Sequence, residues 1–368
     1  MEEMQLSALT TGILGSSFYY VYTTLQIPVG MLFDLKNTRM LLTTAALVCS
    51  VGCICFAHSY TLFSLISSRL LIGAGAAFAF IGLSHLLRQH FPLKQFAYMI
   101  GLSETLGFLV TMFGIIGLGV LINQWGWRDF IDGTAVLGII IAFVIWRYVP
   151  DQRNVPKQTN SVIKQLCTIL RSGKLWINGL FVSLSFTVIT VFGAMWAIPF
   201  IQVKLDCSLA QAGFVDSMLF LGAAVSCPLF GYLSGRLSKR RPLMLFSCLT
   251  TALLIIILLF MPALGLMSTA FLMFLIGVCC GAYMLAYSIA NELAPRDALS
   301  TCTGFINTLA MISAPLIQPL IGYLLDLEAN PGVSHVYHIQ NYQTGLSIVP
   351  AGLLVASVLV FFLPEKTS

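Results

Sequence analysis

Apolar residues in this chain occur in long continuous runs separated by short polar stretches. Each run is long enough, at about 1.5 Å per residue of helix, to cross the roughly 30 Å of hydrocarbon in a bilayer. A membrane β-barrel would instead need short segments of alternating polarity. The pattern therefore predicts an all-α membrane protein with eleven transmembrane helices. They are expected near residues 9–33, 40–59, 61–88, 97–122, 130–149, 175–202, 209–233, 242–262, 265–291, 299–325 and 343–363.

Composition supports this prediction independently. Of the 368 residues, 58% are hydrophobic and only 9% are charged. A water-soluble globule of this size would have too little polar surface with that composition. Many of the apolar side chains are therefore expected to face lipid.

Lysine and arginine are distributed unequally between the loops on the two sides of the spans. One set of alternate loops and the C-terminus hold sixteen of the nineteen, whereas the opposite loops hold only Arg128 and Lys204. The positive-inside rule makes the first set cytoplasmic, as in a bacterial inner-membrane protein. The net charge of +5 then reflects loop asymmetry, and no nucleic-acid partner is predicted. The sixteen are Lys36, Arg39, Arg88, Lys94, Arg147, Arg153, Lys157, Lys164, Arg171, Lys174, Arg236, Lys239, Arg240, Arg241, Arg296 and Lys366.

Two related segments show that the chain contains an internal repeat. GMLFDLKNTR at 30–39 and GYLSGRLSKR at 231–240 each close an apolar span at its basic end. We therefore predict two bundles, 1–149 and 175–368, joined by a polar linker at 150–174. The end of the linker is expected to form an amphipathic helix on the cytoplasmic face, with a flexible tether as the alternative.

The two predicted bundles are unequal. The first contains five spans and the second six, and only one span precedes the segment at 30–39 where two precede its counterpart at 231–240. The first bundle is thus expected to lack its opening helix, through truncation or a start assigned too late.

These segments carry a family resemblance. GMLFDLKNTR resembles the major facilitator superfamily loop pattern G-x-L-x-D-x-x-G-x-[KR], with Asn37 in place of the second glycine. Arg69-x-x-x-Gly73-x-Gly75 resembles the fourth-helix motif of that superfamily, and Gly126-Trp127-Arg128 resembles its outer corner. The resemblance implies two pseudo-symmetric bundles, twelve helices in the ancestral form, and transport by alternating access. YVYTTLQIPVGMLFD, SMLFLGAAVSCPLFGYLS and IQPLIGYLLD are most similar to bacterial uptake carriers of anions, amino acids and peptides.

The same resemblance implies a cytoplasmic gate at the repeated segments. In the first half Gly30, Asp34 and Arg39 match the motif, and the resemblance implies that Asp34 pairs with a cation at a neighbouring helix end and caps a helix N-terminus. In the second half Gly231 and Arg240 match it, but Gly235 replaces the acid, so the two gates are expected to be unequal. Arg240 and its basic neighbours could alternatively bind anionic lipid.

Polar residues inside the spans are candidates for a substrate cavity, because burying them in a membrane is costly. Arg69 is the only basic residue well inside a span, away from its ends, and could bind a carboxylate or phosphate; an arginine satisfied by backbone carbonyls is the alternative. Further candidates share one helical face or lie nearby: Tyr19, Tyr22, Gln26, Trp196, Tyr283, Tyr287, Asn291 and Asn307.

Two carboxylates inside spans are candidates for proton coupling. Glu104 lies on the fourth predicted span and Asp216 on the seventh. A carboxylate shielded from water holds its proton more readily than one in water and can exchange it near neutral pH. Glu104 could alternatively lie in the membrane interface.

The fourth predicted span also carries several glycines. Gly107, Gly114, Gly117 and Gly119 are expected to give this helix a smooth face for close packing against its neighbours. They do not include the Gly-Pro pair of the superfamily's drug antiporters, which makes efflux less favoured than uptake.

The sequence contains no pattern for catalysis or for a cofactor. It has no P-loop, no G-x-S-x-G, and no cluster with metal-ligand spacing among its ten cysteines and five histidines. We therefore predict a non-enzymatic, monomeric secondary transporter without cofactor or metal, which takes up a small polar organic solute (amino acid, dipeptide or organic anion) together with protons. Drug or metabolite efflux, or a sensor or inactive truncated carrier on the same scaffold, are the alternatives.

Overall fold

A computed structural model describes residues 7–150, 162–237, 239–262, 264–295, 298–328 and 337–365, and none of these residues forms a strand. Ten helical segments in this part of the chain are long and apolar enough to cross a bilayer. The helix α1 (Ala8–Leu35) is less apolar, but it packs among them as the eleventh. The predicted all-α membrane fold is thus confirmed.

Five of the spanning helices precede the linker and six follow it. The N-terminal half contains α1, α2 (Thr38–Ala57), α3 (Leu62–His90), α4 (Leu93–Trp125) and α5 (Trp127–Tyr148). In the C-terminal half the six crossings are α7 (Gly173–Ser185) with η2 (Val188–Trp196) and α8 (Ala197–Leu205); α9 (Leu209–Arg236); α10 (Arg241–Phe260); α11 (Leu266–Cys279) with η3 (Cys280–Met284) and α12 (Leu285–Leu293); α13 (Leu299–Met311) with α14 (Ser313–Glu328); and α15 (Ile339–Leu346) with α16 (Ile348–Leu359) and η5 (Val360–Phe362).

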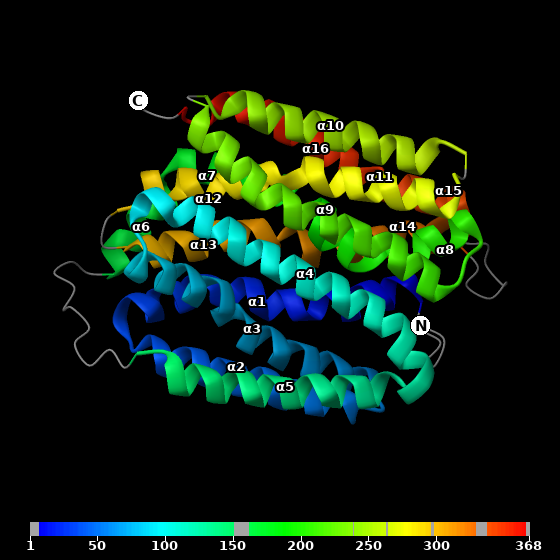
Figure 1. Ribbon diagram of the computed structural model, residues 1–368, viewed down its shortest axis with the longest axis horizontal. Helices are drawn as coiled ribbons and strands as arrows, with labels where there is room; N and C mark the ends of the chain where they lie inside the picture. The colour runs from blue at the N-terminus through cyan, green and yellow to red at the C-terminus, as the bar shows by residue number, and fades with distance from the viewer. Residues whose placement is uncertain are drawn as a thin grey trace.

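The two halves lie side by side with their helices along the long axis (Figure 1). They meet along two pairs of helices, in which α1 packs against α13 and α14, and α4 packs against α9. The linker contains α6 (Val162–Arg171), which lies at the end of the bundles that the sequence predicts to be cytoplasmic and contacts α7 and α13. Residues 151–161 of the predicted linker lie outside the described residues.

Helix ends coincide with residues that cap them. The hydroxyl of Ser7 accepts a hydrogen bond from Thr10 N at the start of α1. Thr61 with Ser64, and Ser208 with Gln211, form reciprocal capping boxes at the starts of α3 and α9. Such caps satisfy N–H groups that the first helical turn leaves unpaired, so the sequence itself determines where these helices begin.

Two crossings of the C-terminal half are not regular α-helices. The first passes from α7 through the π-helical segment η2 to α8, and the fourth passes through the 3₁₀ segment η3 between α11 and α12. Gln318 Nε2 donates to Thr190 O inside η2 and so satisfies one of its carbonyl groups. Irregular backbone at membrane depth is tolerated where protein surrounds it or where it lines a cavity.

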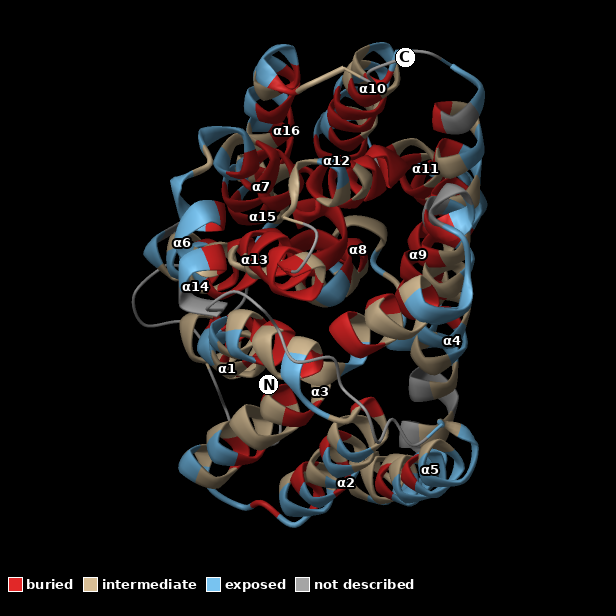
Figure 2. Cartoon of the chain, turned by 90° about the vertical axis from the view of Figure 1, so that its left-hand side faces the viewer, coloured by how far each residue is buried: buried red, intermediate tan, exposed pale blue. Residues whose placement is uncertain are grey.

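Glycines allow helices to pack closely in both halves. In the N-terminal half a Cβ atom at Gly73 of α3 would lie 2.3 Å from Phe18 O of α1. A Cβ atom at Gly222 of α9 would lie 2.2 Å from Phe274 O, and one at Gly277 of α11 would lie 2.1 Å from Leu219 O, so these helices touch backbone to backbone. In α4, by contrast, a Cβ at Gly107 or Gly114 would meet nothing within 4 Å. Buried residues are concentrated in the C-terminal half, whereas few residues of α2 and α5 are buried and α5 is largely exposed (Figure 2).

Candidate functional site

A cavity of about 120 Å³ lies between the two halves. Its lining combines aromatic and sulfur-containing side chains with a few polar groups. The N-terminal half contributes Tyr22, Phe80 and Glu104, and the C-terminal half contributes Phe186, Tyr283, Met284, Tyr287, Asn307 and Met311. The cavity therefore belongs to both halves.

A hydrogen-bond network centred on Asn307 joins the halves beside this cavity. Asn307 Oδ1 accepts from Tyr287 Oη at 2.7 Å, and Asn307 Nδ2 donates to Gln26 Oε1 at 2.8 Å and to Tyr22 Oη at 3.2 Å. Gln26 Nε2 in turn donates to Ala77 O of α3. The network links four helices, and it holds hydroxyl and amide groups where a polar ligand could replace one partner by another.

Glu104 is the carboxylate of the cavity wall. It lies on α4 opposite the tyrosines of η3 and α12. No lysine or arginine is among the cavity-lining residues in the described part of the chain. A charged Glu104 would thus lack a cationic partner in the wall, and its charge would be sensitive to any ligand placed beside it.

On the side that is predicted to be cytoplasmic, α1 and α3 contact α13 of the opposite half. Asp34 Oδ2 accepts hydrogen bonds from both Thr301 N (3.1 Å) and Thr301 Oγ1 (2.8 Å). Thr301 lies in the first turn of α13, where N–H groups have no intrahelical acceptor and the helix dipole favours a negative charge. Asp34 therefore caps a helix that belongs to the opposite half.

Arg88 at the end of α3 makes the most extensive contact at this face. Its guanidinium donates to Asn291 Oδ1, Thr303 Oγ1, Leu299 O and Ser300 Oγ, all in the C-terminal half. His85, one turn earlier, also contacts Ser300 Oγ, at 3.0 Å. By sequence alone Arg88 is only a basic residue of a loop; its spacing of three from His85, which puts both on one helix face, is the signal that could have found it.

Close backbone contacts accompany these polar ones. A Cβ at Gly30 would lie 2.7 Å from Ser300 O, and a Cβ at Gly304 would lie 2.4 Å from Gln26 O. The α1 and α13 backbones can approach this closely because neither position has a side chain.

Several predicted site residues lie away from the cavity. Arg69 Nη2 donates to Gly15 O, and its guanidinium lies 5.6 Å from the Phe18 ring centroid, so it packs between α1 and α3. Tyr19 follows Phe18 on α1, and its ring packs edge-on against the Phe18 ring. Neither Arg69 nor Tyr19 is among the cavity-lining residues, although the Tyr19 ring contacts that of Tyr22 with centroids 6.5 Å apart.

Trp196 and Asp216 lie within the core of the C-terminal half. Trp196 belongs to η2 and is 1% exposed; Asp216 belongs to α9 and is fully buried. Among the described residues, neither Trp196 Nε1 nor either carboxylate oxygen of Asp216 has a hydrogen-bond partner. A buried carboxylate without a partner is costly when charged.

Two of the other predicted gate residues, Arg39 and Arg240, contact groups of their own half. The Arg39 guanidinium lies 4.8 Å from the Trp146 ring centroid of α5. Arg240 forms a fork with both oxygens of Glu292, and its backbone N–H donates to Glu365, so it ties together the cytoplasmic ends of the C-terminal half. Gly231 of α9 lines a small cavity of about 10 Å³ together with Tyr287 and with Phe96 and Ile100 of α4. Gly30, Asp34 and Gly231 thus lie where the two halves meet.

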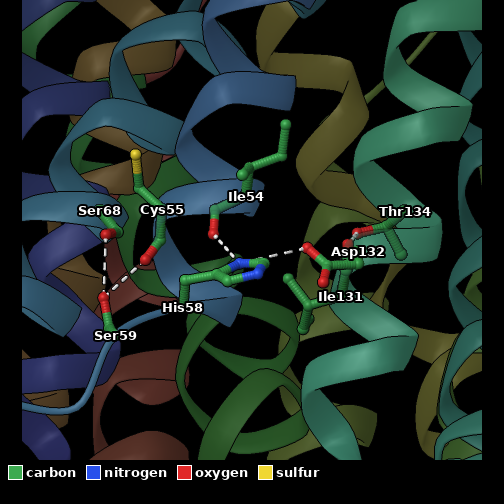
Figure 3. A network of polar contacts seen from close by, with 8 residues as sticks. All are labelled: Ile54, Cys55, His58, Ser59, Ser68, Ile131, Asp132 and Thr134. Carbon is green, nitrogen blue, oxygen red and sulfur yellow. Dashed lines mark hydrogen bonds and ion pairs between the residues drawn. The ribbon is translucent and has the colours of Figure 1, made fainter.

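Polar contacts at the outer end of the N-terminal half also stay within that half (Figure 3). His58 Nδ1 lies 3.0 Å from Ile54 O and 3.7 Å from Asp132 Oδ1. Ser59 Oγ donates to Cys55 O and lies 3.4 Å from Ser68 Oγ. These contacts connect α2, α3 and α5.

Comparison with known families agrees with this architecture. Residues 1–318 match the family described as Major Facilitator Superfamily. The chain belongs to the Major Facilitator Superfamily. It is accordingly an integral membrane transporter.

The names of similar members of this superfamily state different substrates and different directions of transport. "Probable galactarate/D-glucarate transporter GarP" of Escherichia coli strain K12 is 20% identical over 98% of this chain and 87% of its own length. "Multidrug resistance protein MdtG" of Rahnella is 24% identical over 76% and 70%. "Nitrite extrusion protein" of Bacillus subtilis is 25% identical over 66% and 60%.

Solved structures of superfamily transporters share the fold. A bacterial homologue of the human lysosomal transporter Spinster, in an inward-facing and occupied conformation, superposes with a TM-score of 0.68 at 18% identity, covering 97% of this chain and 89% of its own. A mutant form of the nucleoside transporter NupG gives a TM-score of 0.72 at 12% identity, covering 97% and 91%.

Proposed function

We propose that this protein takes up a small polar organic solute together with protons, by alternating access, as a monomer of a bacterial inner membrane. The observation that carries this proposal is the cavity shared by the two halves, with its Asn307 network and the single carboxylate of Glu104. A site at the interface of two repeats becomes accessible from each side in turn when one half rocks against the other.

The cavity favours a small, hydroxyl-bearing solute. At roughly 30 Å³ per water molecule in the liquid, its volume corresponds to about four waters, and a further opening of either face would enlarge it. Tyrosine hydroxyls and an asparagine amide suit hydroxyl groups, and the relatives named for galactarate and D-glucarate give a reason to test hydroxylated organic acids first.

An anionic substrate would couple its own binding to that of a proton. Two negative charges in one small buried cavity repel strongly, so an anion can enter beside Glu104 only when Glu104 carries a proton. Release of the anion to the cytoplasm would then be accompanied by release of that proton. Glu104 is therefore the proposed coupling residue.

The second buried carboxylate, Asp216, provides a prediction that decides between Glu104 and Asp216 as the coupling residue. Asp216→Asn is close in shape and removes a carboxylate that has no partner among the described residues, so we expect the fold to persist and pH-driven accumulation to stay near wild type. Uptake by proteoliposomes under an imposed pH gradient measures this. Loss of accumulation with retained exchange would assign coupling to Asp216.

Transport by purified protein in proteoliposomes tests the proposed function. Thermal stabilisation by galactarate, D-glucarate, amino acids and dipeptides selects the substrate, since a ligand of the folded state raises the unfolding temperature. Inward flux of the radiolabelled solute is then followed with the lumen alkaline, with and without a protonophore. If the protonophore abolishes uptake, proton symport is supported. If the solute moves only outward, against the inward proton gradient, symport is contradicted.

Efflux is the second candidate function, because MdtG and the nitrite extrusion protein are also similar to this chain. A lumen made acidic instead of alkaline would then drive accumulation. A protein that binds solute without either flux or counterflow would be a sensor or an inactive carrier.

A further inference from the structure

The outer end of α1 is held by contacts that mirror those at its cytoplasmic end. Leu9 N donates to Asp326 Oδ2 of α14 at 2.9 Å, and Ala8 N donates to Tyr337 Oη at 3.0 Å. Tyr337 Oη itself donates to Asp326 Oδ1 at 2.5 Å. An aspartate of the C-terminal half therefore caps a helix of the N-terminal half, just as Asp34 caps α13 in the opposite direction.

The capping of α1 is complete only with these contributions from the other half. The first regular helical hydrogen bond runs from Thr11 N to Ser7 O, and of the N–H groups before it Thr10 N is satisfied by the Ser7 hydroxyl. Ala8 N and Leu9 N depend on Tyr337 and Asp326. When the outer ends of the halves separate, both groups lose their partners. The contact thus exists only while the outer face is closed.

The two aspartates lie in the same short sequence pattern. Asp34 belongs to GMLFDL at 30–35 and Asp326 to GYLLDL at 322–327, both of the form G-x-L-x-D-L at the last turn of a helix. The glycines of the two segments also both allow a facing backbone to approach closely. A Cβ at Gly30 would lie 2.7 Å from Ser300 O, and a Cβ at Gly322 would lie 2.6 Å from Ala8 O. Each segment combines a close backbone approach with a cap on the facing helix.

We propose that GYLLDL, with Tyr337, forms the outer gate of the transporter as the counterpart of GMLFDL at the cytoplasmic gate. The two gates act at opposite ends of one pair of antiparallel elements, α1 and α13–α14. Both capping contacts are formed in this structure. Opening either face breaks one cap and leaves the other intact.

The hydroxyl of Tyr337 is suited to its position between a donor and an acceptor. Burial and the hydrogen bond to Asp326 raise the pKa of Tyr337, so the hydroxyl retains the proton that it donates to Asp326. Its oxygen remains available to Ala8 N. A Tyr337→Phe variant removes this link but keeps the ring that packs edge-on to Tyr342.

Hydrogen–deuterium exchange of the full chain in nanodiscs tests the proposal without a substrate. The inference rests on the alternating access proposed above, but this test does not depend on the identity of the solute or on the direction of its transport. Asp326→Ala should speed exchange at residues 8–10 by about fivefold or more, as expected for loss of a helix cap. It should also slow exchange at residues 299–303, because the outward-open population grows at the expense of states with a broken cytoplasmic cap.

The decrease at the far end is the decisive observation. A merely structural cap would change exchange near residues 8–10 and leave residues 299–303 as in the wild type, and that result would overturn the proposal. Asp34→Ala should give the converse pattern, faster at 299–303 and slower at 8–10. If Asp326→Ala unfolds, the milder Tyr337→Phe is expected to produce the same reciprocal pattern with smaller amplitude.

Asp132→Ala is the matched control. Asp132 is also an aspartate at the outer end, but its contact with His58 stays within the N-terminal half (Figure 3). We expect it to leave exchange at 299–303 unchanged. A reciprocal effect in this variant as well would show that any loss of an outer carboxylate shifts the equilibrium, and would contradict a specific gate at Asp326.

Discussion

Glu104→Gln is expected to abolish accumulation of the solute against its gradient while leaving exchange across the membrane. Glutamine keeps the size and hydrogen-bonding capacity of a protonated glutamate, but it cannot release a proton. With an imposed difference of one pH unit, a carrier that moves one proton with each solute can concentrate it up to about tenfold. The variant should therefore reach a ratio of about one.

Two measurements on the same proteoliposomes check this result. Accumulation under the pH gradient reports coupling, and counterflow at equal pH reports binding and the conformational change. Wild-type accumulation by Glu104→Gln would exclude Glu104 as the coupling residue. Loss of counterflow as well would show that Glu104 is needed for binding, so Glu104→Asp, which keeps a titratable group, should then restore part of both activities.

Gly304→Ala is expected to reduce transport by about tenfold or more without unfolding the protein. The new Cβ would lie 2.4 Å from Gln26 O, so α1 and α13 could not close at the cytoplasmic face. Overpacking of this kind costs roughly 1–3 kcal/mol, which is enough to depopulate the closed state. Alanine is also the better helix former, so the helix itself is not weakened.

Gly107→Ala is the matched control for this substitution. It makes the same change in a helix of the other half, where the added Cβ would meet nothing within 4 Å. Counterflow rates and thermal unfolding temperatures of both variants should be compared. Equal rates would contradict the idea that close approach at Gly304 is required for transport.

The helices were predictable from the sequence because each crossing needs a long apolar run, and the capping residues confine its ends. Site residues were predictable where helical spacing placed polar groups on one face, as for Tyr22 and Gln26, or Tyr283 and Tyr287. Their meeting at Asn307 depends on packing between halves, which no local pattern contains.

Arg69 and Arg88 show where the sequence misleads. Arg69 stood out because it is a charge inside a span, yet its guanidinium donates to the backbone carbonyl of Gly15 and lies beside the Phe18 ring. Arg88 looked like an ordinary loop cation, yet it makes four hydrogen bonds across the interface. Distance from the membrane centre can be read from a sequence, whereas the partner on a facing helix cannot. The close packing predicted from the glycines of α4 was wrong at Gly107 and Gly114 for the same reason.

The backbone contact between α9 and α11 determines which surfaces can slide. Gly222 and Gly277 interlock so tightly that one helix cannot be displaced along the other by even a single residue without a clash. On its other side α9 contacts α4 of the opposite half less tightly: a Cβ at Gly101 would lie 3.2 Å from Cys227 O, and Thr105 Oγ1 donates a hydrogen bond to Ala224 O. When the halves move, we therefore expect α9 and α11 to move together as one rigid unit and the displacement to occur between α4 and α9.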